Sequence, residues 1–298
     1  MFAGLSSTWP WNPGALVILL LFVVFYLLGL RRVYALHEAM SPARIIAFFS
    51  GIIIAALLLL TPIDTIGRTQ LFSVHMAQAV ILITLCSPLL LAGSPAVLLQ
   101  PLIELPVARQ IVRLLTHPLL ASLLFNINFL LWHAPLIYAA TQKDPTLYDI
   151  QLLSIFLTSL LNWWPLIGSV QELREMGYPL QMLYAFFDGQ PVDIFAFVLV
   201  FSFVPLYSQY VIPAQLGLSP FADQAVGGAL LLIPGLVDLV VMTPLFFRWL
   251  GQIEKRTNQA DEERQRLAEM EEEWEDEEED DDEAIHQHAV EVRSQDRS

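Results

Sequence analysis

The sequence predicts an all-α, polytopic membrane protein with seven transmembrane helices. The 298 residues are 55% apolar and their mean hydropathy is +0.56, which is too high for a soluble domain of this length. A helix needs roughly 20 apolar residues to cross the hydrocarbon of a bilayer. Seven segments of this kind follow one another: Gly14–Leu30, Ala43–Pro62, Leu71–Gly93, His117–Ala140, Gln151–Val170, Val192–Tyr210 and Ala225–Leu250. The sixth is expected to open on a helix break at residues 188–191.

The distribution of lysine and arginine predicts the orientation. The first, third and fifth connections carry Arg31, Arg32, Arg44, Arg109, Arg113 and Arg174. The second, fourth and sixth carry only Arg68 and Lys143. The odd connections are therefore expected in the cytoplasm, with the N-terminus outside and the C-terminus inside. The third connection, residues 106–116, groups its polar residues on one face and predicts a short helix in the cytoplasmic interface.

The acidity of the chain belongs to its C-terminal part. Residues 271–283 contain twelve acids and no base, so they contribute −12 of the formal net charge of −15. We therefore expect a transmembrane domain over residues 1–250 and a cytoplasmic part over residues 251–298. The latter is predicted to begin as a charged helix and to end as a disordered acidic tail. Docking of a basic partner, or metal capture through His286 and His288, are the alternatives for this tail.

Two histidines are expected deep in apolar surroundings, near the outer ends of neighbouring spans. His75 lies within about one helical turn of the start of span three, and His133 lies in the outer part of span four. An unpaired polar group in hydrocarbon is costly, so each ring needs a partner. Asp64 and Asp223 fall near the same surface. One hypothesis is a shared metal site with His75 and His133 as ligands; the other is a separate hydrogen bond from each ring to a carbonyl or carboxylate.

Polar residues also recur at helical spacing on three spans. They are His75, Gln78 and Cys86 on span three, Asn126 and His133 on span four, and Tyr148, Gln151, Ser154, Thr158 and Asn162 on span five. Such stripes are expected to face neighbouring helices, where they most often hold helices together. Cys86 is the only cysteine, which excludes an internal disulfide, and it is expected to be a packing residue.

Three carboxylates are predicted in the cytoplasmic half of the membrane. They are Asp188, Asp193 and Asp238. A carboxylate in mid-span costs about 2.5–3.5 kcal/mol on insertion scales, so these groups are expected to be protonated or hydrogen-bonded. A proton or ion path is the sharper hypothesis. With the expected helix break, it favours a transporter as an alternative function.

Several short sequences, in order, resemble one known family. They are HMAQ at 75–78, PLLLAGSP at 88–95, WHAPLIY at 132–138, WWPL at 163–166, PLY at 205–207 and DQAVGG at 223–228. Together they resemble the caa3-type cytochrome c oxidase assembly factor family, CtaG, over residues 60–250. The resemblance implies a multi-pass protein of the plasma (inner) membrane that is needed to produce active haem–copper oxidase.

The resemblance also implies partners and a site. Oxidase subunits are the implied partners, and a role in copper delivery is commonly supposed for the family. His75, His133 and Asp223 stand where the family motifs place two histidines and an aspartate. On this hypothesis the two rings hold Cu(I), Asp223 orients one of them, and Asp64 supports the site. Met76 could add a soft thioether of the kind that suits Cu(I), although neighbouring residues on a helix diverge by about 100°.

The chain departs from the family pattern at positions that matter for a metal. Ala79 stands where the family usually has a second histidine, and Tyr148, Gln151 and Leu152 replace a histidine-rich stretch. An HxxxH pair on one helix face is a credible metal clamp, whereas a single histidine is not. Copper binding and the identity of the client subunit are therefore left open by the sequence.

The expected function is that of an assembly factor for a haem–copper oxidase that handles Cu(I) at the outer face. The alternatives are a proton- or ion-linked transporter and a scaffold that binds oxidase subunits without any ligand. No nucleophile–base pair, phosphate-binding loop or zinc signature is present in the sequence, which predicts that the protein is not an enzyme. Nothing in it points to nucleic acid.

Overall fold

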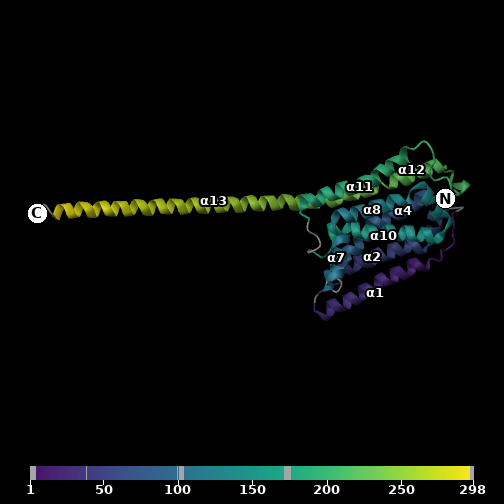
Figure 1. Cartoon of the computed structure of the whole chain (residues 1–298), viewed down its shortest axis with the longest axis horizontal. Helices are drawn as coiled ribbons and strands as arrows, with labels where there is room; N and C mark the ends of the chain where they lie inside the picture. Colours follow the sequence, from purple (N-terminus) through teal and green to yellow (C-terminus); the bar gives the residue numbers. More distant parts are fainter. Residues whose placement is uncertain (1–4, 38, 99, 101–103, 171–175, 296–298) are drawn as a thin grey trace. The chain divides into compact units, whose positions relative to one another are not determined.

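Helices account for the architecture of the chain (Figure 1). The computed structural model describes residues 5–37, 39–98, 100, 104–170 and 176–295. It divides into two compact units, residues 1–245 and residues 246–298. Arg174, which contributes to the predicted orientation, lies outside the described residues, as do the side chains of His286 and His288.

Six helices in the described residues are long and apolar enough to cross a membrane. They are α1 (Pro13–Ala35), α2 (Pro42–Leu60), the Phe72–Gly93 helix, α10 (Pro145–Ile167), α11 (Tyr178–Phe201) and the apolar part of the segment that begins at Pro220. A bent pair, α7 (Pro106–Leu115) and α8 (Pro118–Trp132), meets at 64° and provides a seventh if it is counted as one span. The all-helical membrane fold is thus confirmed, with six or seven candidate spans; the orientation stays a prediction.

The sixth span differs from its prediction. The expected break at residues 188–191 is wrong, because α11 runs without interruption through Pro191 and ends at Phe201, and not at Tyr210. Proline removes one backbone donor, but a membrane helix tolerates this where side chains and neighbouring helices satisfy the freed groups. The carbonyl that loses its donor here is that of Phe187, and Gln190 donates to the neighbouring Phe186 carbonyl at 3.0 Å. The break occurs instead in the seventh span, at residues 231–232, between α12 (Pro220–Leu230) and α13 (Ile233–Gln295).

The third span contains a turn of π-helix. Its three parts are α4 (Phe72–Ile81), η1 (Leu82–Cys86) and α5 (Ser87–Gly93). A π turn shifts the backbone register, and such turns are common at functional sites. The Ile83 carbonyl accepts a hydrogen bond from Trp163 Nε1 at 2.7 Å, which ties this turn to α10.

The Phe72–Gly93 helix is the most buried of the candidate spans. Its N-terminal half, α4, packs against α12 and against α3 (Pro62–Thr69), while α5 packs against α2 and α10. A short helix, α9 (Pro135–Lys143), follows α8 and packs on α10. Cys86 is fully buried among the apolar side chains of α2 and α10, as expected of a packing residue. The N-terminal turns of α4 and α10 and the C-terminus of α8 therefore converge beneath α3 and α9.

The described part of the second unit, residues 246–295, is helical. In the structure α13 continues through the acidic run as far as Gln295. Like charges four residues apart destabilise a helix. The acidic sequence therefore predicts that this part of α13 is only marginally stable when no partner is bound. The disordered acidic tail stays a prediction.

Candidate functional site

The two histidines singled out by the sequence meet in the interior of the bundle. His75 lies in the first turn of α4, and His133 forms the C-terminal cap of α8. Their Nε2 atoms lie 3.2 Å apart, and the two side chains are 0% and 1% exposed. Two imidazoles from neighbouring spans are thus brought together, as the depth of the two residues predicts.

Nδ1 of His133 is hydrogen-bonded to the backbone of its own helix. His133 Nδ1 lies 2.7 Å from the Phe129 carbonyl oxygen. A carbonyl only accepts, so Nδ1 must carry the proton of the neutral ring. His133 Nε2 therefore presents a lone pair to His75.

A chain of three hydrogen bonds sets the protonation of His75 in the same way. Gln78 Nε2 donates to the Leu58 carbonyl at 2.9 Å, which turns Gln78 Oε1 toward Tyr148. The Tyr148 hydroxyl donates to that Oε1 at 3.0 Å. Because a phenol has one proton, its oxygen accepts from His75 Nδ1, which lies 2.9 Å away. His75 Nε2 then carries no proton and also presents a lone pair.

Two lone pairs therefore face each other across 3.2 Å. Gln151 Nε2 lies 3.3 Å from His75 Nε2 and donates to it, whereas Gln151 Oε1 is buried without a hydrogen-bond partner in the described structure. Facing acceptors repel each other unless a positively charged species lies between them. This arrangement suits a cation that binds imidazole nitrogen.

Aromatic side chains separate the histidine pair from the surface. Tyr138 on α9 lies edge-on to His75 and stacks on His133, with ring centroids 5.2 and 5.7 Å apart. The Tyr207 hydroxyl donates to the His133 carbonyl, and burial raises the pKa of Tyr207, which keeps this donor protonated. Tyr210 hydrogen-bonds Tyr138 and donates to the Gly67 carbonyl of α3 at 3.1 Å.

Two of the predicted supporting residues have other roles. Asp223 was expected to orient an imidazole, and this is wrong: its carboxylate accepts from Phe72 N at 2.7 Å, Ser73 N at 3.2 Å and the Ser73 hydroxyl. It therefore caps the N-terminus of α4 and supports His75 only through the helix.

Met76 packs toward α12, where its Cγ would lie 3.1 Å from a Cβ at Gly227, and it does not join the histidines.

Asp64, the third supporting residue, lies in α3 and is 3% exposed. Burial raises the pKa of its carboxyl to about 7; the charge of Asp149 adds to the rise, and Arg68 and a hydrogen bond from Gln78 oppose it. Gln78 also accepts from the tyrosine that holds His75. Asp64 is thus connected to the histidine pair through Gln78 without touching it.

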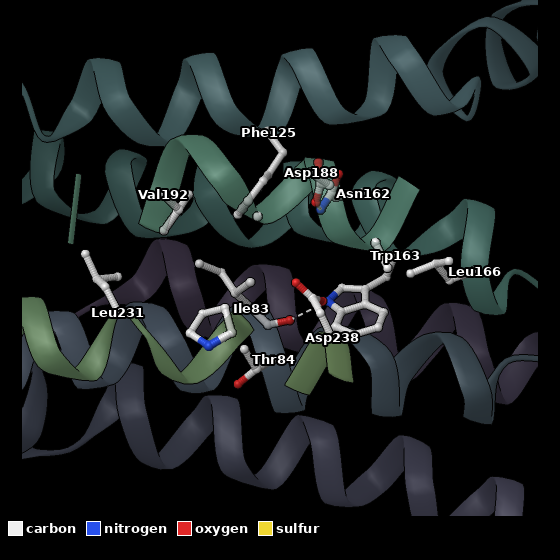
Figure 2. Close-up of a pocket in the computed structure, with 13 residues that line it drawn as sticks. Ile83, Thr84, Phe125, Asn162, Trp163, Leu166, Asp188, Val192, Leu231 and Asp238 are labelled. Atoms are coloured by element: carbon white, nitrogen blue, oxygen red, sulfur yellow. Dashed lines mark hydrogen bonds between the residues drawn. The ribbon is translucent and has the colours of Figure 1, made fainter. Parts of the chain in front are cut away.

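The predicted acidic residues gather at a separate place. Asp188 on α11 and Asp238 on α13 line a small cavity beside the π turn (Figure 2). Asp193 on α11 lies close by, with Oδ2 3.9 Å from the position of a Cβ at the lining residue Gly189. Within the part of the chain that the structure describes, no group of three or more histidine, cysteine, aspartate or glutamate side chains is arranged to hold a metal ion. The histidine pair and the acidic group are therefore two distinct features.

Comparison with known families decides the class of the protein. The model of the cytochrome c oxidase caa3 assembly factor family (Caa3_CtaG) matches residues 24–252. The chain belongs to this family. Comparisons with curated proteins and with solved structures give no match. The predicted resemblance is confirmed, and family membership indicates an assembly factor for cytochrome c oxidase in a membrane.

The partners of His75 were the residues that the sequence did not assign to the site. Tyr148 and Gln151, which stand where the family pattern has a histidine-rich stretch, both lie at hydrogen-bonding distance from His75. Ala79 and Leu152 are buried and contribute no donor or acceptor side chain. The signal that could have found them was the helical spacing of span five, which puts Tyr148 and Gln151 on one polar face of α10.

Proposed function

We propose that this assembly factor holds Cu(I) as its cargo between His75 and His133 during assembly of a haem–copper oxidase. The observation that carries the proposal is the pair of Nε2 lone pairs 3.2 Å apart in a site with almost no exposure. Imidazole suits copper, and Cu(I) accepts fewer ligands than the three or four protein ligands typical of zinc. The missing third ligand therefore favours Cu(I) over Zn²⁺.

The rest of the site supports the same proposal. Metal-binding histidines commonly donate their other ring nitrogen to a fixed acceptor, which orients the ring. Phe129 O and Tyr148 fill this role here. The charge bias of the connections supports an outer-face location in the plasma membrane, with an oxidase subunit as the partner and no catalytic reaction in this chain.

The test is metal analysis of the purified full-length protein. The wild-type chain is loaded with Cu(I) under reducing conditions, desalted and analysed beside a His75→Ala/His133→Ala variant and a His117→Ala control. We expect about one copper per chain in the wild type and the control, none in the double variant, and no retained zinc. Equal copper in all three proteins would remove the metal role.

Oxidase assembly in cells separates this proposal from a ligand-free scaffold. The double variant should insert into the membrane at normal levels and yield an oxidase with reduced copper content. If an oxidase subunit co-purifies with the metal-free variant and oxidase activity stays normal, the scaffold function is correct instead.

A further inference from the structure

A small cavity lies in the middle of the bundle, away from the histidine pair. Its volume is about 40 Å³, enough for one or a few water molecules. Figure 2 shows side chains from α8, α10, α11 and α13 around it, with the π turn of the third span on one side. Asp188 and Asp193 lie midway along α11, so the cavity is placed far from both ends of that span.

The first of its three carboxylates is fully engaged. Asp188 accepts from Asn162 Nδ2 at 2.5 Å and from Asn126 Nδ2 at 3.2 Å. Tyr184 donates to Asn162 Oδ1 at 2.8 Å, which fixes the orientation of that amide. A carboxylate surrounded by donors in this way is stabilised as an anion.

The other two carboxylates both lie beside Gly189, and neither has a hydrogen-bond donor in the described structure. A Cβ atom at Gly189 would lie 3.0 Å from Asp238 Oδ2 and 3.9 Å from Asp193 Oδ2, and a Cβ at Gly235 would lie 3.2 Å from Asp193 Oδ2. The two glycines thus give space to the two acids. Asp193 Oδ1 is buried without a partner, and neither carboxyl receives a hydrogen bond from the residues that the structure describes.

Positive charge is missing from this place. The titratable side chains that line the cavity are Asp188 and Asp238, with Asp193 and Tyr184 close by. The other lining residues include Phe125 on α8, Asn162 and Trp163 on α10, and Thr84 on the π turn. No lysine, arginine or histidine lines it among the described residues. Three anions in a membrane interior without a counter-ion are unfavourable, so the group requires a cation.

A polar atom without a partner also points to a ligand here. Asn126 is 6% exposed, and its Nδ2 donates to Asp188, so its amide lies at the acidic group. Its Oδ1 accepts no hydrogen bond in the described structure. This oxygen is an acceptor available to a water molecule or a proton donor beside the acidic group.

We propose that the cavity is a proton-binding site, in which Asp193 and Asp238 share one proton and Asp188 is a fixed anion. A proton is favoured over a metal ion because the acids are not arranged to hold a metal and the cavity is small. This site goes beyond the role in oxidase assembly and does not depend on copper at His75 and His133. It requires no break in α11, so it differs from the transporter that the sequence suggested.

Infrared spectroscopy of the full-length protein in lipid tests the proposal. A protonated carboxyl group has a C=O stretch that is separate from the carboxylate and amide bands and shifts in D₂O. At neutral pH we expect this band in the wild type, in sodium-containing and sodium-free buffers alike. Asp193→Asn and Asp238→Asn should each remove the same component of this band, because either substitution removes the need for the shared proton. The component of Asp64, whose pKa burial raises to about 7, should remain in both variants. Asp149→Asn, which replaces another carboxyl near a span end, should leave it unchanged.

Chemical labelling of the wild type covers the case in which a variant fails to fold. An apolar carbodiimide reacts with protonated carboxyl groups, and peptide mass analysis should find the adduct on Asp193 or Asp238. Three results would overturn the proposal: no carboxyl band beyond that of Asp64 and no adduct on Asp193 or Asp238 in the wild type, a band that neither variant reduces, or a band that appears only after sodium is removed.

Discussion

Tyr148 holds His75 in one protonation state. Its hydroxyl oxygen lies 2.9 Å from His75 Nδ1, and its single proton is donated to Gln78 at 3.0 Å. The phenol oxygen therefore accepts a hydrogen bond from Nδ1–H, which leaves Nε2 unprotonated and facing His133. Tyr148 thus decides which nitrogen of His75 is available as a ligand.

Replacement of Tyr148 by phenylalanine should weaken both the fold and the site. His75 Nδ1 and Gln78 Oε1 would each lose a partner in a buried place, which costs about 1–3 kcal/mol of stability for an unsatisfied group. Loss of the residue that orients a metal ligand should lower Cu(I) affinity about 10–100-fold. Thermal unfolding and competition with a chromogenic Cu(I) chelator measure the two effects.

The control is Tyr26→Phe, since Tyr26 is a buried phenol that donates to the Gly93 carbonyl at 3.3 Å in another part of the bundle. This variant should lose some stability and keep its Cu(I) affinity. Equal affinities for both variants would show that Tyr148 does not orient His75.

The Asp223→Asn variant should destabilise the helix that carries His75. The amide keeps one acceptor oxygen, and its nitrogen would face a backbone N–H that Asp223 now satisfies. The expected loss is about 1–3 kcal/mol, measured by thermal unfolding in detergent. Asp144→Asn is the matched control, because Asp144 caps α10 by accepting from Thr146 N at 2.8 Å and asparagine caps helices about as well as aspartate. Equal melting temperatures for the two variants would contradict the capping role.

A methyl group at Gly67 should disturb the hydrogen bonds behind His75. A Cβ at this position would lie 2.0 Å from Gln78 Oε1 and 3.0 Å from the Tyr148 hydroxyl, so the Gln78 amide must move. We expect Gly67→Ala to cost about 1–3 kcal/mol, as overpacking usually does. Gly251→Ala is the control, because nothing lies within 4 Å of a Cβ there.

A double-mutant cycle identifies the cause of that loss. In a Gln78→Ala background the space is already open, so adding Gly67→Ala should have little further effect on the melting temperature. If the two substitutions are additive, the clash with Gln78 is not the reason.

The depth of a residue in the membrane could be predicted from the sequence, but the direction in which its side chain points could not. The lengths of the apolar segments placed His75 and His133 at one level, and their rings do meet. The same reasoning placed Asp223 at that level but could not show that it faces the start of α4, because rotation of α12 is set by packing. The Asp223 carboxylate accepts hydrogen bonds from backbone N–H groups at the start of α4. The pattern of side chains in the sequence does not indicate a bond of this kind.

Backbone irregularities were the second limit of the sequence. Pro191 indicated a break in α11, yet the break lies at residues 231–232 and a π turn lies at residues 82–86. The π turn is tied to another helix by the hydrogen bond from Trp163 to Ile83. Local propensity cannot report such bonds because the partners are about 80 residues apart in the chain.

Stability should depend on pH through Asp64. Burial raises the pKa of this carboxyl to about 7, above the value of about 3.9 expected in an unfolded chain. The folded state therefore favours the protonated form, and the stabilisation is fully present below about pH 4 and is lost as the pH rises through about 7. The melting temperature in detergent, followed by tryptophan fluorescence between pH 5 and 8.5, should fall with increasing pH. Asp64→Asn should flatten this dependence, whereas Asp261→Asn, in the exposed part of α13, should retain it; a slope that Asp64→Asn leaves unchanged would assign the pH dependence to another group.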